Sequence, residues 1–283
     1  VNLREGKLYE NFDLKDKLAN EHPYHEWVKK IIRIDKQITS KKESSLFDSQ
    51  NLRQRKIAAG YTMEELELIL HPMVEEAKEA TGSMGDDTPI AIRSEKYRPL
   101  SHFFRQKFSQ VTNPPIDSIR EQSRMSLKTR FGNLRDVLDS NSYQDSVFVM
   151  DSPVVTNSIF NKMLKFGKDE AVTIDCCFPI TNITLKEKIK SIQDEAEAAV
   201  LSGKQHIVLT DINANNENVS VPMILATAAV HSSLTRKGIR SFISLHVQSA
   251  ECLDTHYFAV LIGVGATTVN PYLAQEWISE RYE

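Results

Sequence analysis

The pattern of hydrophobic and polar positions divides the chain into two halves. In the second half, short apolar runs bounded by turn residues alternate with segments whose apolar residues recur at helical spacing. The apolar runs predict strands at 172–177, 206–210, 242–247 and 267–269. The periodic segments predict helices at 185–200, 222–237 and 256–262. Thr184 and Glu187 have the spacing of a capping box at the start of the first helix, and Gly203 ends it.

This repetition of strand and helix is typical of an α/β fold. A parallel strand can be reached only by a crossover connection, and the crossover helix then covers the sheet. We therefore predict an α/β lobe over residues 151–283, built mainly from parallel βα repeats. Its first three strands should be neighbours in one sheet.

The first half has a weaker pattern, which predicts a mixed helical and loop-rich lobe. Residues 1–46 are charged and interrupted by proline, and we interpret them as a connector whose short helices need a neighbour. Residues 47–150 form the next predicted lobe, in which Thr62 and Glu65 have capping-box spacing ahead of a helix at 63–71. A helical face at 103–108 should stop before two prolines, and a further helix should begin within 117–121.

Composition and charge argue against several classes of partner. The 283 residues are 41% hydrophobic and 26% charged, which is ordinary for a globular protein. The net charge of -3 provides no field that would attract nucleic acid or an anionic membrane. No apolar stretch approaches the roughly 20 residues that span a bilayer, and the first residues lack the apolar core of a signal peptide. We therefore expect a cytoplasmic protein.

The cysteines favour reduced, structural thiols. Cys176, Cys177 and Cys252 do not provide the even, spaced set of a secreted disulfide framework. Metal sites usually draw on cysteines separated by two residues, whereas the first two are adjacent within an apolar run. We favour packing as small hydrophobic side chains over a metal site. The eight histidines show no HExxH spacing.

One loop is the first candidate for a functional role. It consists of Thr81, Gly82, Ser83, Met84, Gly85, Asp86 and Asp87. Two glycines permit backbone conformations closed to other residues and leave main-chain groups accessible. The residues alone fit a tight structural turn at least as well. A catalytic pair of aspartates is disfavoured, because adjacent residues need not point to one site.

Three further segments are weaker candidates. Asn113, Pro114 and Pro115 form a rigid corner suited to holding the loop. Residues 263–265 resemble a βα phosphate-binding turn but lack the GxGxxG pattern. Residues 211–221 follow a strand end, where open α/β sheets bind ligands, although their asparagines fit a solvated turn more simply.

Several stretches, in order along the chain, resemble the large subunit of glutamate synthase. They are Gly60-Tyr61-Thr62 with the later His71-Pro72-Met73, TGSMGDDTP at 81–89, QVTNPPID at 110–117, and Asn270-Pro271-Tyr272-Leu273; His22-Pro23-Tyr24 also fits. Together they span residues 22–273, nearly the whole chain. The two longest are specific enough to make chance a poor explanation.

The resemblance implies one module of a longer enzyme. In that family the large subunit contains a glutaminase that frees ammonia, a central domain, an FMN-binding barrel with an iron–sulfur cluster, and a β-helix. The matching residues fall on the central domain, which implies a non-catalytic domain with an α/β half like a degenerate flavin barrel. It also implies that residues 81–87, with the corner at 113–115, lie between domains and contribute to an ammonia tunnel. Such a tunnel must exclude water.

We therefore expect no catalytic, cofactor-binding or metal residue in this fragment. The family's glutaminase nucleophile is an amino-terminal cysteine where this sequence has Val1-Asn2, and no cysteine cluster or flavin barrel is present. The implied partners are the amidotransferase and FMN-binding domains of the same chain, with a reductase subunit or ferredoxin. The electron donor stays open between NADPH, NADH and ferredoxin. The alternative is a stand-alone α/β domain that binds a small anionic ligand.

Overall fold

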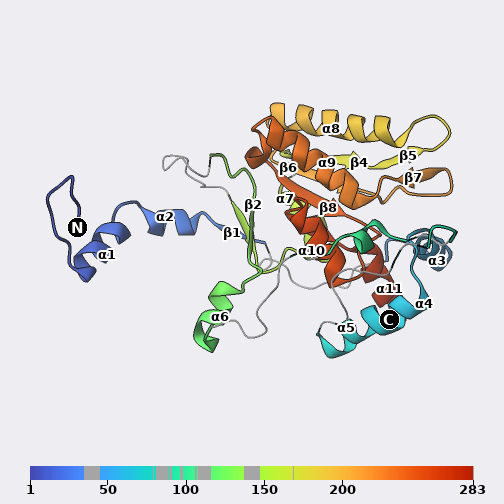
Figure 1. The fold of residues 1–283 in the computed structure, drawn as a ribbon, viewed down its shortest axis with the longest axis horizontal. Coiled ribbons are helices and arrows are strands. Elements are labelled where there is room, and N and C mark those ends of the chain that lie inside the picture. Colours follow the sequence, from blue (N-terminus) through green and yellow to red (C-terminus); the bar gives the residue numbers. More distant parts are fainter. Residues whose placement is uncertain are drawn as a thin grey trace.

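A parallel sheet lies at the centre of the computed structural model, which describes residues 1–34, 45–78, 80, 89, 91–95, 98–105, 107, 116–136, 147–167 and 169–282. The sheet has the order β4-β6-β8-β9 (Figure 1). Its strands are β4 (Ala171–Asp175), β6 (His206–Thr210), β8 (Ser244–Gln248) and β9 (Thr268–Asn270). Every pairing is parallel. The predicted α/β class and the three neighbouring parallel strands are confirmed.

Three helices connect these strands and cover one face of the sheet. They are α8 (Leu185–Leu201), α9 (Met223–Arg236) and α10 (Thr255–Gly263). Because the strands follow one another in sequence order and such crossovers are right-handed, the connecting helices fall on the same side. Alternate strand residues such as Ile207, Leu209 and Val247 are fully buried against them. The predicted capping box at the start of α8 is present.

A second, smaller sheet packs on the opposite face. Its strands are β1 (Ile32–Arg33), β2 (Thr129–Phe131) and β3 (Phe148–Met150), with β3 in the centre. Together with α7 (Asn157–Phe166) they bury Phe131, Met150 and Phe160 against Val208 of the parallel sheet. The parallel sheet is thus covered on both faces, as parallel sheets generally are.

The predicted strand at 172–177 ends earlier than its apolar run. The main chain leaves the parallel sheet at Cys176, and β5 (Cys177–Pro179) pairs antiparallel with β7 (Asn218–Ser220). The Cys177 amide donates to Asp175 Oδ1 at 2.8 Å, which supports the change of direction. This two-stranded sheet extends beyond the carboxyl edge of the parallel sheet (Figure 1).

The segment from Thr62 to Glu76 is helical, as predicted, although its middle turn is widened. It runs through α4 (Met63–Glu65), a π-helical turn (Leu66–Leu70) and α5 (His71–Glu76), and its predicted capping box is present. Pro72 cannot donate the usual i→i−4 hydrogen bond, and the π turn directly precedes it. Leu66 and Leu70 pack against Ala274 and Trp277 of α11 (Tyr272–Tyr282). The neighbouring α3 (Ser49–Ala58) also contacts α11.

The predicted helical face at 103–108 is wrong. A short 3-10 helix (Leu100–Phe103) ends there, and Phe104 has extended dihedral angles. Phe103 is 51% exposed, so no core face holds the chain in a longer helix. The next predicted helix is found as α6 (Ser118–Arg124), where Asp117 accepts hydrogen bonds from the amides of Ile119 and Arg120. A second 3-10 helix (Arg240–Phe242) precedes β8.

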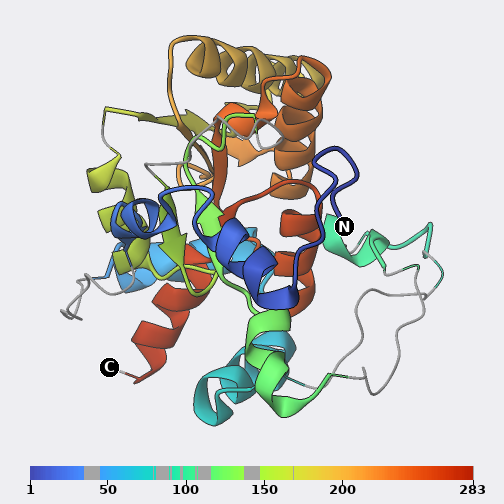
Figure 2. The ribbon, with the colours of Figure 1, turned by 90° about the vertical axis from the view of Figure 1, so that its left-hand side faces the viewer.

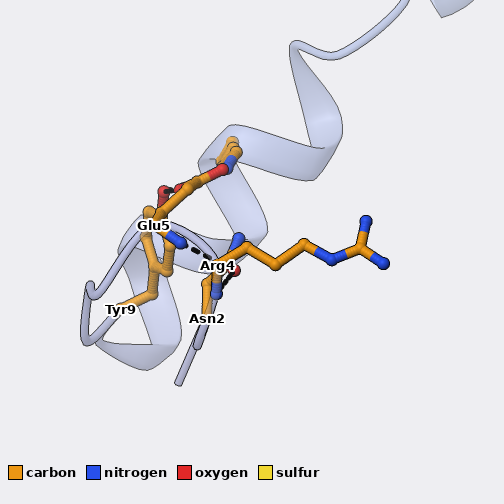
Figure 3. A network of polar contacts seen from close by, with 5 residues as sticks. Asn2, Arg4, Glu5 and Tyr9 are labelled. Carbon is orange, nitrogen blue, oxygen red and sulfur yellow. Dashed lines mark hydrogen bonds and ion pairs between the residues drawn. The ribbon is translucent and has the colours of Figure 1, made fainter.

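The amino-terminal helices bury none of their residues. α1 (Asn11–Ala19) and α2 (Tyr24–Lys29) extend away from the sheet in Figure 1 and lie in front of it in Figure 2. Polar contacts stabilise the first turn of the chain (Figure 3). Asn2 Oδ1 accepts hydrogen bonds from the amides of Arg4 and Glu5, and the Tyr9 hydroxyl donates to the Glu5 carboxylate at 2.5 Å. Among the described helices, none is long and apolar enough to cross a membrane.

Candidate functional site

The predicted interdomain loop and corner, residues 81–87 and 113–115, lie outside the described residues. Their assignment therefore stays a prediction. The structure does describe the carboxyl edge of the parallel sheet, where open α/β sheets place their ligands. Asp211 follows β6 there, Ser249 to Glu251 follow β8, and Tyr272 follows β9.

Asp211 is a buried carboxyl group at this edge, only 2% exposed. Its two oxygens accept the Ala250 amide at 3.0 and 2.9 Å, and Oδ2 also accepts the Ser249 hydroxyl at 3.1 Å. Burial raises the pKa of Asp211 from 3.8 to about 7, and the nearby charge of Glu251 adds to the effect. Asp211 thus exchanges its proton close to neutral pH.

Glu251 is the second carboxyl group of the edge. Its Oε2 accepts the Met223 amide at 3.0 Å, at the start of α9, and the hydroxyl of Tyr257. A helix amino terminus favours a negative charge. Burial nevertheless raises the pKa of Glu251 above its usual value.

A cavity of about 270 Å³ opens beside these two acids. Its lining includes Arg55, Asp211, Ser220, Ala250, Glu251 and Tyr272. Tyr272 is fully buried beside Asp211. Burial raises the pKa of Tyr272, and the neighbouring Asp211 carboxyl raises it further.

Two of the sequence motifs meet at this edge. Tyr61, from the stretch at 60–62, donates its hydroxyl to the Ala250 carbonyl at 2.8 Å. It packs with Tyr272 and Leu273, from the stretch at 270–273, in one apolar cluster. Gly60 has φ of +79°, a conformation that favours glycine. Stretches about 210 residues apart in the sequence thus pack against each other at the carboxyl edge of the sheet.

Sequence reasoning missed a set of polar side chains on the face of the parallel sheet that meets the smaller sheet. His206 Nδ1 lies 3.1 Å from His246 Nε2, and His246 Nδ1 lies 2.7 Å from Thr268 Oγ1. Nearer the carboxyl edge, Thr210 donates to Gln248, and Gln248 to Asn270. The sequence does contain a sign of this set, because polar residues stand at every second position within the predicted strands.

The segment 263–265 is not a phosphate-binding turn of the predicted kind. It follows the carboxyl end of α10 and leads into β9, so it joins helix to strand. The free backbone groups at that end of a helix are carbonyls, which disfavour anions. Gly265 instead offers its carbonyl to Arg240 at 2.8 Å. In the segment 211–221, residues 215–217 form an exposed turn, while Asp211 and Ser220 line the cavity.

All three cysteines are buried. Cys176, Cys177 and Cys252 are buried free thiols, and burial raises the pKa of each above its ordinary value. Within the described ranges, no group of three or more histidine, cysteine or acidic side chains is arranged to hold a metal ion.

Comparison with known proteins matches the chain to one family. The family model described as the glutamate synthase central domain matches residues 54–283. The large chain of glutamate synthase [NADPH] from Azospirillum brasilense is 52% identical over 100% of this chain and 19% of that protein. Ferredoxin-dependent glutamate synthase 2 from Synechocystis sp. is 37% identical over 99% of this chain and 19% of that protein.

The Bacillus subtilis glutamate synthase [NADPH] large chain is 35% identical, covering 97% of this chain and 18% of that protein. The chain therefore spans about a fifth of the length of these curated relatives. Two of the stretches that carry the resemblance, 60–62 and 270–273, pack together at the carboxyl edge of the sheet. On this evidence the chain belongs to the glutamate synthase central domain family.

Proposed function

We propose that this chain is the non-catalytic part of a glutamate synthase that links its glutaminase and FMN-binding domains. The observation that carries the proposal is the match of nearly the whole chain to about a fifth of each relative. The enzyme as a whole makes glutamate from glutamine and 2-oxoglutarate, so ammonia freed in one domain must reach another. A rigid α/β body between them holds the two sites at a fixed separation.

In this proposal, the interdomain loop at 81–87 and the corner at 113–115 contribute backbone atoms to the wall of the ammonia tunnel. Close-packed backbone excludes bulk water, which would protonate ammonia and release it. Glycines at 82 and 85 allow the backbone to follow such a wall without side chains that narrow it.

The other parts of the enzyme supply the cofactors and the electrons. FMN and an iron–sulfur cluster belong to the neighbouring synthase domain, and the reductant enters through a reductase subunit or ferredoxin. Named relatives include both NADPH-dependent and ferredoxin-dependent enzymes, so the two sources remain open. We place the enzyme in the cytoplasm.

Two experiments test the proposal. The gene should continue in frame on both sides of this sequence, with a glutaminase region before it and an FMN-binding region after it. The purified 283-residue chain should retain no flavin and hydrolyse no glutamine above background, as measured by absorbance near 450 nm and by ammonia release. A stoichiometric yellow flavin or clear glutaminase turnover would show that this region has an active site of its own.

A further inference from the structure

A second cavity, of about 390 Å³, opens at the amino edge of the parallel sheet. β8 begins there at Ser244, and Thr267 directly precedes β9. Two arginines line this cavity, Arg130 from the smaller sheet and Arg240 from the 3-10 helix before β8. No acidic side chain stands among the described residues of the lining. The cavity wall therefore carries two positive charges and no negative charge.

Arg240 is half-buried, and it has no ion pair in the part of the chain that the structure describes. Its Nε donates to His231 Nδ1 at 3.2 Å, its Nη1 to the Ile243 carbonyl at 2.7 Å, and its Nη2 to the Gly265 carbonyl at 2.8 Å. A guanidinium has five N–H donors, so one N–H on each Nη is left without a described acceptor. Burial lowers the pKa of Arg240, as it does for a cation that leaves water.

The other polar groups of the lining also have hydrogen-bond donors to spare. Arg130 is exposed, and its guanidinium contacts no acceptor within the described ranges. Thr267 Oγ1 accepts the Leu245 amide at 3.1 Å, but neither its hydrogen nor the Ser241 hydroxyl meets an acceptor among the described residues. Ser244 differs, because its hydroxyl is engaged with the backbone of Gly132.

The helix ends at this edge do not cancel the positive charge. The carboxyl end of a helix carries about half a negative charge on its free carbonyls. At the end of α9, the Gly238 amide donates to the Thr235 carbonyl at 3.0 Å. After α10, Arg240 donates to the Gly265 carbonyl. These carbonyls have partners, so the two guanidinium groups dominate the charge of the cavity.

We propose that this cavity binds the phosphoryl group of a small molecule, with Arg130 and Arg240 neutralising its charge. Ser241 and Thr267 then donate to its oxygens. A phosphoryl group carries a charge of about −1.5 to −2 at pH 7 and three strong acceptor oxygens, which matches two guanidinium groups and two hydroxyls. A carboxylate has a single charge and two oxygens and would use fewer of these donors. The lining also has apolar side chains, so a short carbon skeleton can accompany the phosphoryl group.

The competing explanation is that the arginines are purely structural. Arg240 alone would fit it, because its guanidinium joins the carbonyls of Ile243 and Gly265. Arg130 separates the two explanations, since it makes no such contact in the described structure. Its loss should leave the fold intact and weaken the binding of the anion.

The test is calorimetric titration of the 283-residue chain with glycerol 3-phosphate and with inorganic phosphate at pH 7. We expect saturable binding, about tenfold or more tighter than that of succinate, and no binding of the neutral glycerol. Arg130→Gln should weaken it about tenfold, and Ser241→Ala about two- to tenfold. Arg53→Gln, at an exposed arginine of α3 outside the lining, is the matched control and should leave affinity unchanged.

Circular dichroism establishes that each variant is folded before titration. Tighter binding of glycerol 3-phosphate than of phosphate supports an ester as the ligand, and equal binding supports free phosphate. The proposal is overturned if the folded chain binds neither probe up to about 10 mM, a generous limit for a site with two charged contacts. Binding that Arg130→Gln leaves unchanged, or equal binding of succinate, overturns it as well. None of these outcomes bears on the linking function, which does not use this cavity.

Discussion

Acid should destabilise the contact between the two sheets through a pair of buried histidines. The rings of His206 and His246 are stacked with centroids 5.3 Å apart, and Phe131 and Phe148 pack against them. Only one of the two facing nitrogens can carry a proton, because their separation is 3.1 Å. A further proton would place two N–H donors face to face within an apolar cluster.

The expected magnitude follows from the shift in the pKa of His206. Burial lowers it from 6.5 to about 4, so between these values the unfolded chain binds more protons than the folded chain. The stability that the neutral ring provides is complete above the unfolded pKa and is lost as pH falls below it. At about 1.4 kcal/mol per pH unit, moving from pH 7 to pH 5 costs roughly 2 kcal/mol.

Other groups also change the stability between pH 7 and pH 5. The contribution of His206 must therefore be measured as the difference between wild type and a variant that lacks this histidine. Burial also lowers the pKa of His246, which adds to the acid loss, whereas the raised pKa of Asp211 makes the fold more stable as pH falls towards 4. His206→Phe keeps an aromatic ring and removes one titrating group. Urea unfolding at pH 7 and pH 5 should show wild type losing about 2 kcal/mol more than this variant.

A control variant separates this effect from general changes in charge. His25→Gln alters an exposed histidine and should give the same pH dependence as wild type. If wild type and His206→Phe lose equal stability between pH 7 and pH 5, the buried pair is not the origin of any acid sensitivity. The absolute stability of His206→Phe does not enter the comparison.

Two further predictions concern a glycine and the thiols. Gly265→Ala should lower the free energy of unfolding by about 2–3 kcal/mol, because φ is +118° and the added carbon would lie 2.3 Å from His231 Nδ1. In thermal melts Gly263→Ala, with nothing within 4 Å, should stay close to wild type, and equal melting of the two variants would refute the steric argument. The three buried cysteines should react slowly with Ellman's reagent in the folded chain and fully in guanidinium chloride; rapid reaction of the native chain would contradict their burial.

The parallel sheet could be predicted because its signals are local. Each buried strand is a compact apolar run, and the helix after β4 carries its own capping box at Thr184 and Glu187. Parallel pairing then follows from the crossover rule. The interpretation of 263–265 as a βα phosphate-binding turn was wrong, because this turn joins the end of a helix to a strand.

The smaller sheet and the cavity depend on contacts between distant segments, which no local sequence pattern predicts. β1 has two residues and β2 three, too few to show a period, and their pairing with β3 joins distant segments. Asp211 was placed at a strand end, where ligands are common, but its burial and its contacts with Ala250 and Tyr272 come from other parts of the chain. Tertiary packing, which no local pattern encodes, sets the pKa of such a group.

The central claim is that this region couples ammonia release to ammonia use. Its most direct test is Gly82→Val in the full-length enzyme, with glutamine hydrolysed and glutamate formed from 2-oxoglutarate measured in the same reaction. We expect the glutaminase and ammonia-dependent activities to persist while glutamine is consumed without matching glutamate formation. Gly263→Val, at an exposed glycine with nothing within 4 Å, should remain coupled. A Gly82→Val enzyme with the wild-type ratio of the two products would contradict the account.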